Sequence, residues 1–190
     1  MDIDIDTRSD FDPLTYFTNW VKASNIIGDK IVAHPVGVYP QFVPVNPLNG
    51  LCSIPYNVEI SNRFKIDFLH LNIYNFFTSR EQIKELLQHE PNYDLLLSPK
   101  IVKQLFQLGE SFDILQKIKP QSVDDLADTI AIIRPGKIGL LHKYISNKAK
   151  YRHLVYKTND SDEFGYKKSH AYAYALVIKL QLHLIGNGIA

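Results

Sequence analysis

Prolines place the strongest constraint on the fold, because they exclude helices from one continuous stretch of the chain. Residues 31–58 contain two glycines and five prolines, the prolines at positions 35, 40, 44, 47 and 55. Proline lacks the backbone donor that a helix interior or a central strand requires, so this stretch predicts only short strands and turns. The segment that follows, FKIDFLHL (64–71), alternates Phe64, Ile66 and Phe68 with the residues between them, and this pattern predicts a strand.

Helix signals dominate most of the remaining chain. Apolar residues recur there at helical spacing, and Ser or Thr stands where several of these runs begin. A capping box of Thr78 and Glu81 marks the first helix after the predicted strand. The predicted helices cover residues 13–24, 78–90, 98–108, 111–118, 122–134, 137–150 and 167–185. We therefore expect an α+β fold, with a small strand-containing region over residues 1–77 and a mainly helical region over residues 78–190.

Composition limits the classes of protein to which this chain can belong. Its 190 residues are 45% apolar and 22% charged, which is ordinary for a folded globular protein. Cys52 is the only cysteine, so an internal disulfide and a cysteine-based zinc site are excluded. No apolar run reaches the roughly 18 residues of a membrane span, and the acidic start is unlike a signal peptide. We expect a soluble, cytoplasmic protein with no membrane partner.

The chain opens with MDIDID, in which aspartates at positions 2, 4 and 6 alternate with apolar residues. Alternate residues of a strand point to the same face, so these carboxylates would form one row. Like charges this close repel each other unless a cation lies among them or one carboxylate is protonated. The stretch is therefore either a solvated tail or one half of a metal site, with Asp67 on a second strand as the other half. Carboxylate oxygens suit Mg²⁺, and two such ions can activate a 3′-hydroxyl and stabilise a leaving pyrophosphate.

Five segments of the chain together resemble one known family, the bacterial DNA polymerase III alpha subunit, a family C polymerase. MDIDIDTRSDFDPLTYF is similar to its Pro-Asp-x-Asp-x-Asp-Phe segment, and AHPVGVYP (33–40) to its His-x-x-Gly-Val-Val stretch. FKIDFLHLNIYNFF (64–77) resembles its Lys-x-Asp-Phe-Leu-Gly-Leu segment. The run from 105 to 137, which ends in RPGK, resembles its fingers region, and FGYKKSHAYAYALV (164–177) its Lys-Ser-His fingers helix. All five occur in the family's order and touch most of the chain.

This resemblance implies a reduced polymerase, palm-like over residues 1–77 and fingers-like over residues 78–190. Asp2, Asp4 and Asp67 match the catalytic palm aspartates that bind Mg²⁺ or Mn²⁺, and Asp6 matches an extra acidic position of the same motif. The expected partners are primed or single-stranded DNA and deoxynucleoside triphosphates. The residues that the resemblance assigns to nucleotide or phosphate binding are Lys65, Arg134, Lys168, Ser169 and His170.

Local charge agrees with DNA binding, although the formal net charge of the whole chain is only +1. Residues 134–168 contain nine Lys and Arg against three acidic residues. Phosphate backbones bind to clusters of this kind. We expect Lys148, Lys150 and Arg152 to contact nucleic acid, and a solvated basic surface is the alternative.

Two family features have no counterpart among these segments. The family has a long thumb insertion between its aspartate segments, whereas about 60 residues separate Asp6 from Asp67 here. The family also has a Gly-Ser loop that grips the triphosphate before the first aspartate. We expect Lys65 and the basic helices, or a replication-protein partner, to provide that grip, and we expect weak activity from the chain alone. Three functions are therefore considered: metal-dependent nucleotidyl transfer, a non-catalytic DNA-binding or replication-accessory role, and a structural domain with solvated aspartates.

Overall fold

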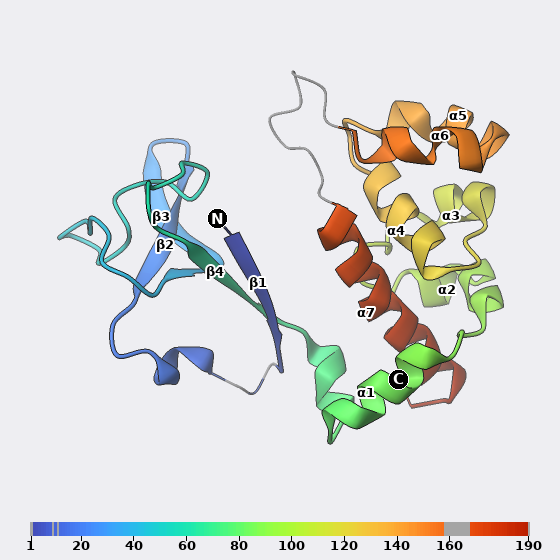
Figure 1. Ribbon diagram of the computed structural model, residues 1–190, viewed down its shortest axis with the longest axis horizontal. Coiled ribbons are helices and arrows are strands. Elements are labelled where there is room, and N and C mark those ends of the chain that lie inside the picture. The colour runs from blue at the N-terminus through green and yellow to red at the C-terminus, as the bar shows by residue number, and fades with distance from the viewer. Residues whose placement is uncertain (1, 9, 11, 158–167, 190) are drawn as a thin grey trace. The chain divides into compact units, whose positions relative to one another are not determined.

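The computed structural model describes residues 2–8, 10, 12–157 and 168–189, and it divides the chain into two compact units, Met1–Thr78 and Ser79–Ala190. The first unit contains a four-stranded sheet and the second is helical, so the α+β class is confirmed (Figure 1). None of the described helices is long and apolar enough to cross a bilayer. The elements of the first unit are β1 (Asp2–Thr7), η1 (Pro13–Tyr16), β2 (Val21–Ile27), β3 (Lys30–Tyr39), β4 (Lys65–His70) and η2 (Asn72–Phe76).

The sheet of the first unit is mixed, with the strand order β1-β4-β3-β2. β1 runs parallel to β4, whereas β3 runs antiparallel to both β4 and β2. The strand predicted at 64–71 is confirmed as β4. Its Ile66 and Phe68 pack with Val38 of β3, and Phe17 covers this small core. Burial of these apolar side chains favours the observed register of β3 against β4, in which Val38 is paired with Ile66.

The helix predicted over residues 13–24 is wrong. Only Pro13–Tyr16 is helical, as a short 3₁₀ turn, and Val21–Ile27 forms strand β2. Gly28 has φ +60° at the turn into β3, a conformation that glycine adopts without a steric penalty, so the chain folds back as a hairpin. The apolar residues over 13–24 have helical spacing, but β2 contains β-branched residues that favour a strand. Hydrogen-bonded pairing of β2 with β3 stabilises the strand more than the spacing stabilises a helix.

Strand β3 is longer than its proline content predicts. It spans Lys30–Tyr39 and includes Pro35. The register between β2 and β3 shifts between Lys22 and Ser24, which leaves residues 34–37 of β3 in a bulge. Proline is tolerated at a bulge because no ladder hydrogen bond is required there.

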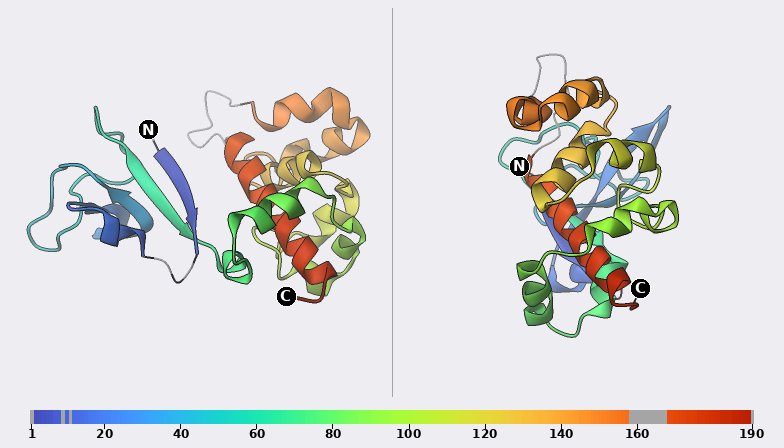
Figure 2. Two further views of the ribbon diagram at one scale, coloured as in Figure 1. Left: turned by 60° about the horizontal axis from the view of Figure 1, so that its bottom comes forward. Right: turned by 90° about the vertical axis from the view of Figure 1, so that its right-hand side faces the viewer.

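The second unit is built around its last helix, which runs alongside α4 (Figure 2). Ile178 of this helix is fully buried in a core that includes Leu126 and Ile130 of α4. Alanines at positions 171 and 175 belong to the same core, and their small side chains allow close helix packing. The described elements are α1 (Arg80–Gln88), η3 (Tyr93–Leu97), α2 (Pro99–Val102), α3 (Phe112–Ile118), α4 (Val123–Ile132), η4 (Ile138–Leu140), α5 (Leu141–Ser146), α6 (Lys148–Val155) and α7 (Lys168–Gly186).

Serines cap two of these helices, one of them at an unexpected position. Ser122 caps α4 as predicted, with its hydroxyl accepting the Asp125 amide at 3.2 Å. α1 is capped by Ser79, whose hydroxyl accepts the Gln82 amide at 3.3 Å, and not by Thr78. A side-chain oxygen at the cap accepts a backbone amide of the first turn that has no carbonyl partner. Thr78 and Ser79 both carry such an oxygen, and the fold places Ser79 at the cap.

Two predicted helices are interrupted where a side chain binds the backbone. The helix predicted over 98–108 is only the single turn α2, and beyond it Oε1 of Gln181 accepts the Phe106 amide at 2.8 Å. The helix predicted over 137–150 breaks at Asn147, whose Oδ1 accepts a backbone amide of α6 at 3.0 Å. Asn and Gln side chains that satisfy backbone groups in this way compete with continued helix.

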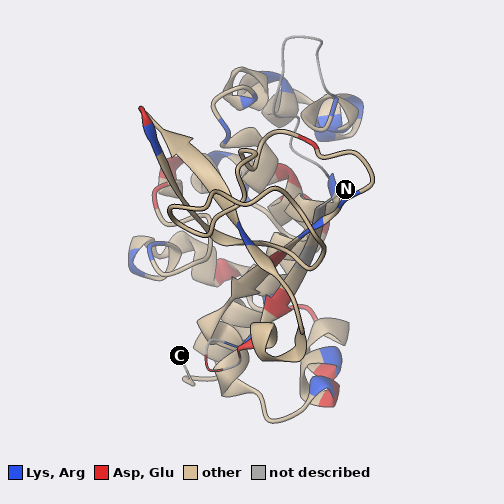
Figure 3. Ribbon diagram, turned by 90° about the vertical axis from the view of Figure 1, so that its left-hand side faces the viewer, with Lys and Arg blue, Asp and Glu red and all other residues tan. Residues whose placement is uncertain are grey.

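Charge is distributed differently over the helices of the second unit (Figure 3). α1 carries both acidic and basic residues, whereas α5 and α6 carry Lys and Arg and no acidic residue. The polar stretch between α6 and α7 lies outside the described residues over positions 158–167. Among the described helices of this unit, α6 carries the most basic residues in the shortest span, Lys148, Lys150 and Arg152.

Candidate functional site

The register of β1 against β4 brings two of the predicted aspartates to adjacent positions. The α-carbon of Asp4 is paired with that of Asp67, and Asp2 is paired with Lys65. Neighbouring strands lie about 4.8 Å apart, so Asp4 and Asp67 are next to each other across the ladder. The side chains of Asp2 and Asp4 lie outside the described part of the structure, and their role as metal ligands stays a prediction.

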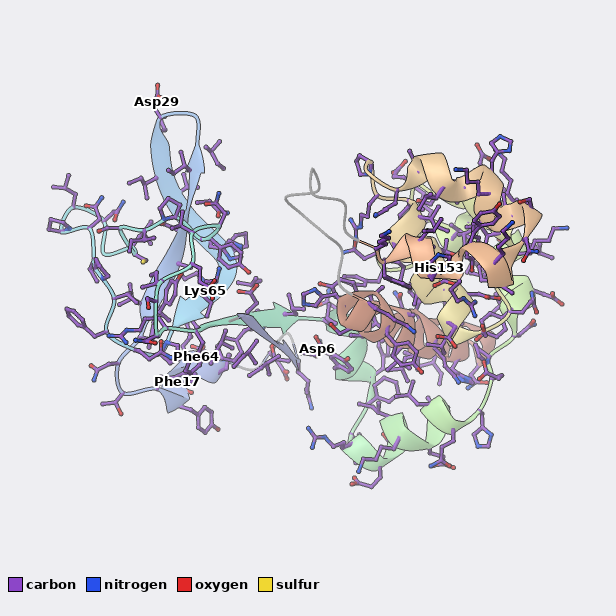
Figure 4. The ribbon with its side chains drawn as sticks, turned by 45° about the horizontal axis from the view of Figure 1, so that its top comes forward. Asp6, Phe17, Asp29, Phe64, Lys65 and His153 are labelled. Atoms are coloured by element: carbon purple, nitrogen blue, oxygen red, sulfur yellow. The ribbon has the colours of Figure 1, made fainter. Side chains whose placement is uncertain are left out.

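Asp67 lies in a polar cluster with His34, Tyr56 and Lys65, here called the Asp67 cluster. Asp67 is only 8% exposed, and its Oδ2 accepts a hydrogen bond from the Tyr56 hydroxyl. Lys65, which Figure 4 labels on β4, is equally buried. Its ammonium donates to the Tyr56 carbonyl and lies 3.7 Å from the centre of the Tyr56 ring. Tyr56 therefore contacts both the buried carboxylate, through its hydroxyl, and the buried ammonium, through its ring and carbonyl.

His34 provides a neutral aromatic surface for the same cluster. Its ring stacks on that of Tyr56, with centres 3.8 Å apart and planes within 5°. Nδ1 of His34 accepts the Gly37 amide at 2.8 Å, which assigns the proton of the neutral ring to Nε2. Burial lowers the pKa of His34, and the nearby Asp67 only partly opposes this. The neutral form is therefore favoured in the folded chain.

The β3 bulge and its glycine make this packing possible. Gly37 is paired with Asp67 in the ladder between β3 and β4. A Cβ at position 37 would lie 2.8 Å from Nδ1 of His34, 3.0 Å from Oδ1 of Asp67 and 3.1 Å from Cε2 of Tyr56. Any larger residue would displace at least one of these groups, because packed interiors leave no space for an added atom.

A second lysine lies near the Asp67 cluster. Nζ of Lys22 donates to the Pro35 carbonyl in the β3 bulge at 3.0 Å. Burial lowers the pKa of Lys22, and its attraction to Asp67 acts in the opposite direction. Lys22 on β2 thus belongs to the electrostatic environment of Asp67, and its positive charge reduces the cost of burying the carboxylate.

Asp6 has different surroundings. It is exposed near the end of β1, as its label in Figure 4 shows, and its Oδ2 accepts the Tyr74 hydroxyl at 2.8 Å. Burial raises the pKa of Tyr74, and the charge of Asp6 raises it further. This contact ties β1 to η2.

The phosphate-binding candidates of the second unit come from two regions. Lys168, Ser169 and His170 form the first turn of α7, whereas Arg134 follows α4 and donates to Oε1 of Gln107 at 2.6 Å. An open depression of about 530 Å³ lies at the start of α7, lined by Asp124, Lys168, Ser169, Tyr172, Ala173 and Leu176. Two of the candidates, a cation and a hydroxyl, therefore face the same hollow.

Two of the three residues expected to contact nucleic acid are paired with carboxylates of α4. Nζ of Lys148 lies 2.9 Å from Oδ2 of Asp125. Arg152 binds Asp125 at 2.6 Å and Asp128 at 2.5 Å. Lys150 is exposed, with its Nζ 5.3 Å from the centre of the Tyr151 ring. The charges of Lys148 and Arg152 are thus largely offset within the unit, and that of Lys150 faces solvent.

Among the described side chains, no three His, Cys, Asp or Glu groups are arranged to hold a metal ion. The donor that is described, Asp67, is a hard oxygen ligand of the kind that Mg²⁺ prefers. Its ladder neighbour Asp4 is a residue of the same chemistry. A magnesium site across β1 and β4 therefore stays a prediction, which the pairing of Asp4 with Asp67 supports.

Sequence reasoning did not identify His34, Gly37 or Tyr56 as parts of the site. His34 and Gly37 belong to the HPVG stretch that carried a family resemblance, and that stretch was the available signal. No sequence signal pointed to Tyr56, because the loop between β3 and β4 brings it to Asp67 only in the folded chain.

Comparison with known proteins adds two findings. A family described as the bacterial DNA polymerase III alpha subunit finger domain matches residues 61–168, which include β4 and Asp67. The DNA polymerase III subunit alpha of Aquifex aeolicus (strain VF5) is 28% identical over 165 residues. That similarity covers 76% of this chain and 13% of the Aquifex protein, so the chain spans a small part of its relative's length.

Proposed function

This chain belongs to the family of bacterial DNA polymerase III alpha subunit finger domains, and we propose that it carries out Mg²⁺-dependent nucleotidyl transfer on primed DNA. The observation that carries the proposal is the pairing of Asp4 with Asp67 across β1 and β4. Asp67 also falls within the range that matches the family. Two adjacent carboxylate residues on paired strands are a suitable foundation for a two-metal site.

Asp2, Asp4 and Asp67 would hold the ions, which are Mg²⁺ or Mn²⁺ in this proposal. Bound ions would activate the primer 3′-hydroxyl and stabilise charge on the leaving pyrophosphate. Lys65, fixed on the Tyr56 ring, offsets the charge of Asp67 and supplies a cation for an approaching phosphate. The palm-like role of residues 1–77 is part of this proposal.

The second unit would bind the substrates, deoxynucleoside triphosphates and DNA. Lys168 and Ser169 at the depression of α7, with His170 beside them, would contact the triphosphate. Arg134 would contact a phosphate beyond α4. Lys150 would bind the DNA backbone, because its charge faces solvent on the basic helix α6. A replication protein that supplies further phosphate contacts is the expected partner.

A non-catalytic DNA-binding or replication-accessory role is the second candidate. The basic character of α5 and α6 favours it, since these helices can bind a phosphate backbone without any metal. The two candidates differ in the role of Asp67. It is essential for nucleotidyl transfer and unnecessary for binding.

Primer extension with Asp67→Asn separates the two candidates. The substitution keeps the shape of the side chain and removes its charge, so it should abolish nucleotide incorporation in Mg²⁺ or Mn²⁺ while DNA affinity stays equal or rises slightly. Asp29→Asn at the exposed tip of the β2–β3 hairpin is the matched control (Figure 4). Incorporation by the wild type and the control, and none by Asp67→Asn, is the expected result. Equal incorporation by all three chains contradicts the role of Asp67. No incorporation by the wild type, even with a replication protein added, contradicts nucleotidyl transfer, and DNA binding without incorporation supports the second candidate.

A further inference from the structure

Asp124 and Tyr172 line the open depression at the start of α7, and the family resemblance assigns a role to neither of them. One face of α7 forms most of the lining, because Lys168, Tyr172 and Leu176 recur at intervals of four residues. Asp124 comes from the first turn of α4. Buried apolar side chains of α4 and α7 pack together in one core, so the two helices hold these lining residues in a fixed arrangement.

The lining of the depression is mostly apolar and includes an aromatic ring that solvent reaches. Tyr172 is 42% exposed, although it is a large aromatic side chain. Ala173 and Leu176 add apolar surface to the same lining. Exposed aromatic side chains stack well on flat rings, and every nucleobase presents such a face.

Two opposite charges line the same depression. Within the described parts of the chain, neither the Asp124 carboxylate nor the Lys168 ammonium forms an ion pair. An ammonium binds phosphate, whereas an ionised carboxylate repels phosphate and accepts hydrogen bonds from N–H groups. A nucleotide combines both matching parts, an anionic phosphate and a base with N–H donors on its edge. The depression therefore matches a nucleotide in charge as well as in apolar surface.

Among the bases, guanine is the best match for a carboxylate. Guanine presents two adjacent donors, N1–H and the N2 amino group, which can bond both oxygens of Asp124 at once. Cytosine and adenine each present one amino group with an acceptor beside it, and thymine presents a single N–H between two carbonyl oxygens. A carboxylate repels these neighbouring acceptors, so the expected preference has guanine first and thymine last.

We propose that this depression binds a nucleotide, with its base stacked on Tyr172 and hydrogen-bonded to Asp124 and its phosphate on Lys168, and that it prefers guanine over thymine. A free deoxynucleoside triphosphate and an unpaired nucleotide of single-stranded DNA present the same chemistry to these residues. The inference rests on the part of the proposed function that makes nucleotides the ligands of the second unit. It requires no metal ion and no residue of the first unit.

Binding to the full chain without divalent cations tests the base preference. Isothermal titration calorimetry with dGTP and with dTTP measures the free nucleotides, and fluorescence anisotropy with oligothymidine, with and without one central guanine, measures the strand. The wild type should bind the guanine ligand about tenfold more tightly, within the range for one bidentate contact to a base. Asp124→Asn should remove this preference, because it replaces one of the two acceptors by a donor. Asp113→Asn, in the first turn of α3 and also exposed, is the matched control and should keep the preference.

Substitution of Tyr172 tests the stacking. Tyr172→Ala should weaken binding of both guanine and thymine ligands about fivefold or more, the lower end of the contribution of one stacked base. Tyr172→Phe keeps the aromatic face and should bind as the wild type does. Tyr16→Ala, at a highly exposed tyrosine of the first unit, is the control and should leave binding unchanged.

The outcomes separate this proposal from the proposed function. A guanine preference that survives Asp124→Asn, or binding that Tyr172→Ala leaves unchanged, overturns the proposal. If the wild type binds nucleotides or DNA with no base preference, the substrates of the proposed function stand and the base site alone is rejected. If it binds neither, the nucleotide ligands of the second unit are wrong and both proposals fall. A preference found only with dGTP, or only with the strand, supports the site and identifies its ligand.

Discussion

Nε of Arg152 donates to Oδ2 of Asp128 at 2.5 Å, and the Asp128 side chain is only 2% exposed. The same carboxylate accepts the hydroxyls of Tyr144 at 2.6 Å and Tyr156 at 2.9 Å. Arg152 also binds Asp125, one helical turn earlier on α4. These contacts join α4 to α5 and α6, so the arginine that sequence analysis assigned to DNA has a structural partner of its own.

Arg152→Ala should therefore destabilise the second unit. Removal of one member of a buried ion pair leaves the other charge uncompensated, at a typical cost of about 3–5 kcal/mol. Arg152 is partly exposed, and the hydroxyls of Tyr144 and Tyr156 would still donate to Asp128 in the variant. We therefore expect a loss at the lower end of this range, about 3 kcal/mol. Urea unfolding followed by circular dichroism measures this. Lys143→Ala, an exposed lysine of α5, should change the free energy of unfolding by less than about 0.5 kcal/mol, and an equal loss in both variants would contradict the buried-pair explanation.

DNA binding should depend more on Lys150 than on a lysine outside the basic helices α5 and α6. Lys150 is exposed on a helix without acidic residues, so Lys150→Glu should weaken binding to single-stranded DNA at every sequence tested. The slope of log affinity against log salt should fall by about 1, the value for one lost phosphate contact. Fluorescence anisotropy at several salt concentrations provides both quantities. Lys84→Glu on α1 makes the same charge change on another helix, and an identical effect there would show that net charge alone decides the affinity.

The sequence predicted the strand of Asp67 and the helices α3, α4 and α7 because their patterns are local. Alternation of apolar residues marks β4, and a serine cap followed by a periodic run marks α4. The hairpin of β2 and β3 was missed because its stability comes from pairing between strands and from the positive φ of Gly28. The break at Asn147 was missed because the apolar spacing continues across it.

The candidate site was predictable to a similar extent. The row of aspartates at positions 2 and 4 and the strand of Asp67 suggested a shared edge, and the ladder pairs Asp4 with Asp67. The contacts of Tyr56 were not predictable, because a loop of irregular structure brings it to Asp67. The ion pairs of Lys148 and Arg152 with α4 could not be predicted either. α4 and α6 are separate segments of the sequence, and the pattern of each helix alone does not show that they pack together.

Glu90 should stabilise the second unit in a manner that depends on pH. Hydrogen bonds from Tyr93 and from the buried Lys179 hold the pKa of Glu90 below its ordinary value of 4.5. A lowered pKa in the folded state contributes stability that is fully present above the unfolded pKa and is lost as the pH falls through the folded pKa. The Glu90 side chain is 62% exposed, so solvent screens these contacts, and Glu90→Gln should lower the free energy of unfolding by only about 0.5 kcal/mol at pH 7.

Comparison across pH provides the check on Glu90. The difference between wild type and Glu90→Gln should be constant above about pH 6 and should shrink below about pH 5, where the wild-type carboxylate becomes protonated. Glu85→Gln, at an exposed position on α1, is the control. A difference that persists unchanged at pH 3 would mean that the substitution acts through packing and not through charge.

Gly37→Ala should disturb the Asp67 cluster specifically, because the new methyl group would meet Nδ1 of His34 at 2.8 Å and Oδ1 of Asp67 at 3.0 Å. Overpacking of this kind typically costs about 1–3 kcal/mol, and displacement of Asp67 should weaken Mn²⁺ binding as well. His34→Ala removes the nearest of these atoms and makes room for the methyl group. The loss of unfolding free energy in the double variant should therefore be smaller than the sum of the losses in the two single variants. Urea unfolding can measure this coupling in a double-mutant cycle.

Gly139→Ala is the control, because no atom lies within 4 Å of the added carbon, and it should leave Mn²⁺ binding unchanged. Additive effects of Gly37→Ala and His34→Ala would show that the bulge glycine is not required for the stacking of His34 on Tyr56.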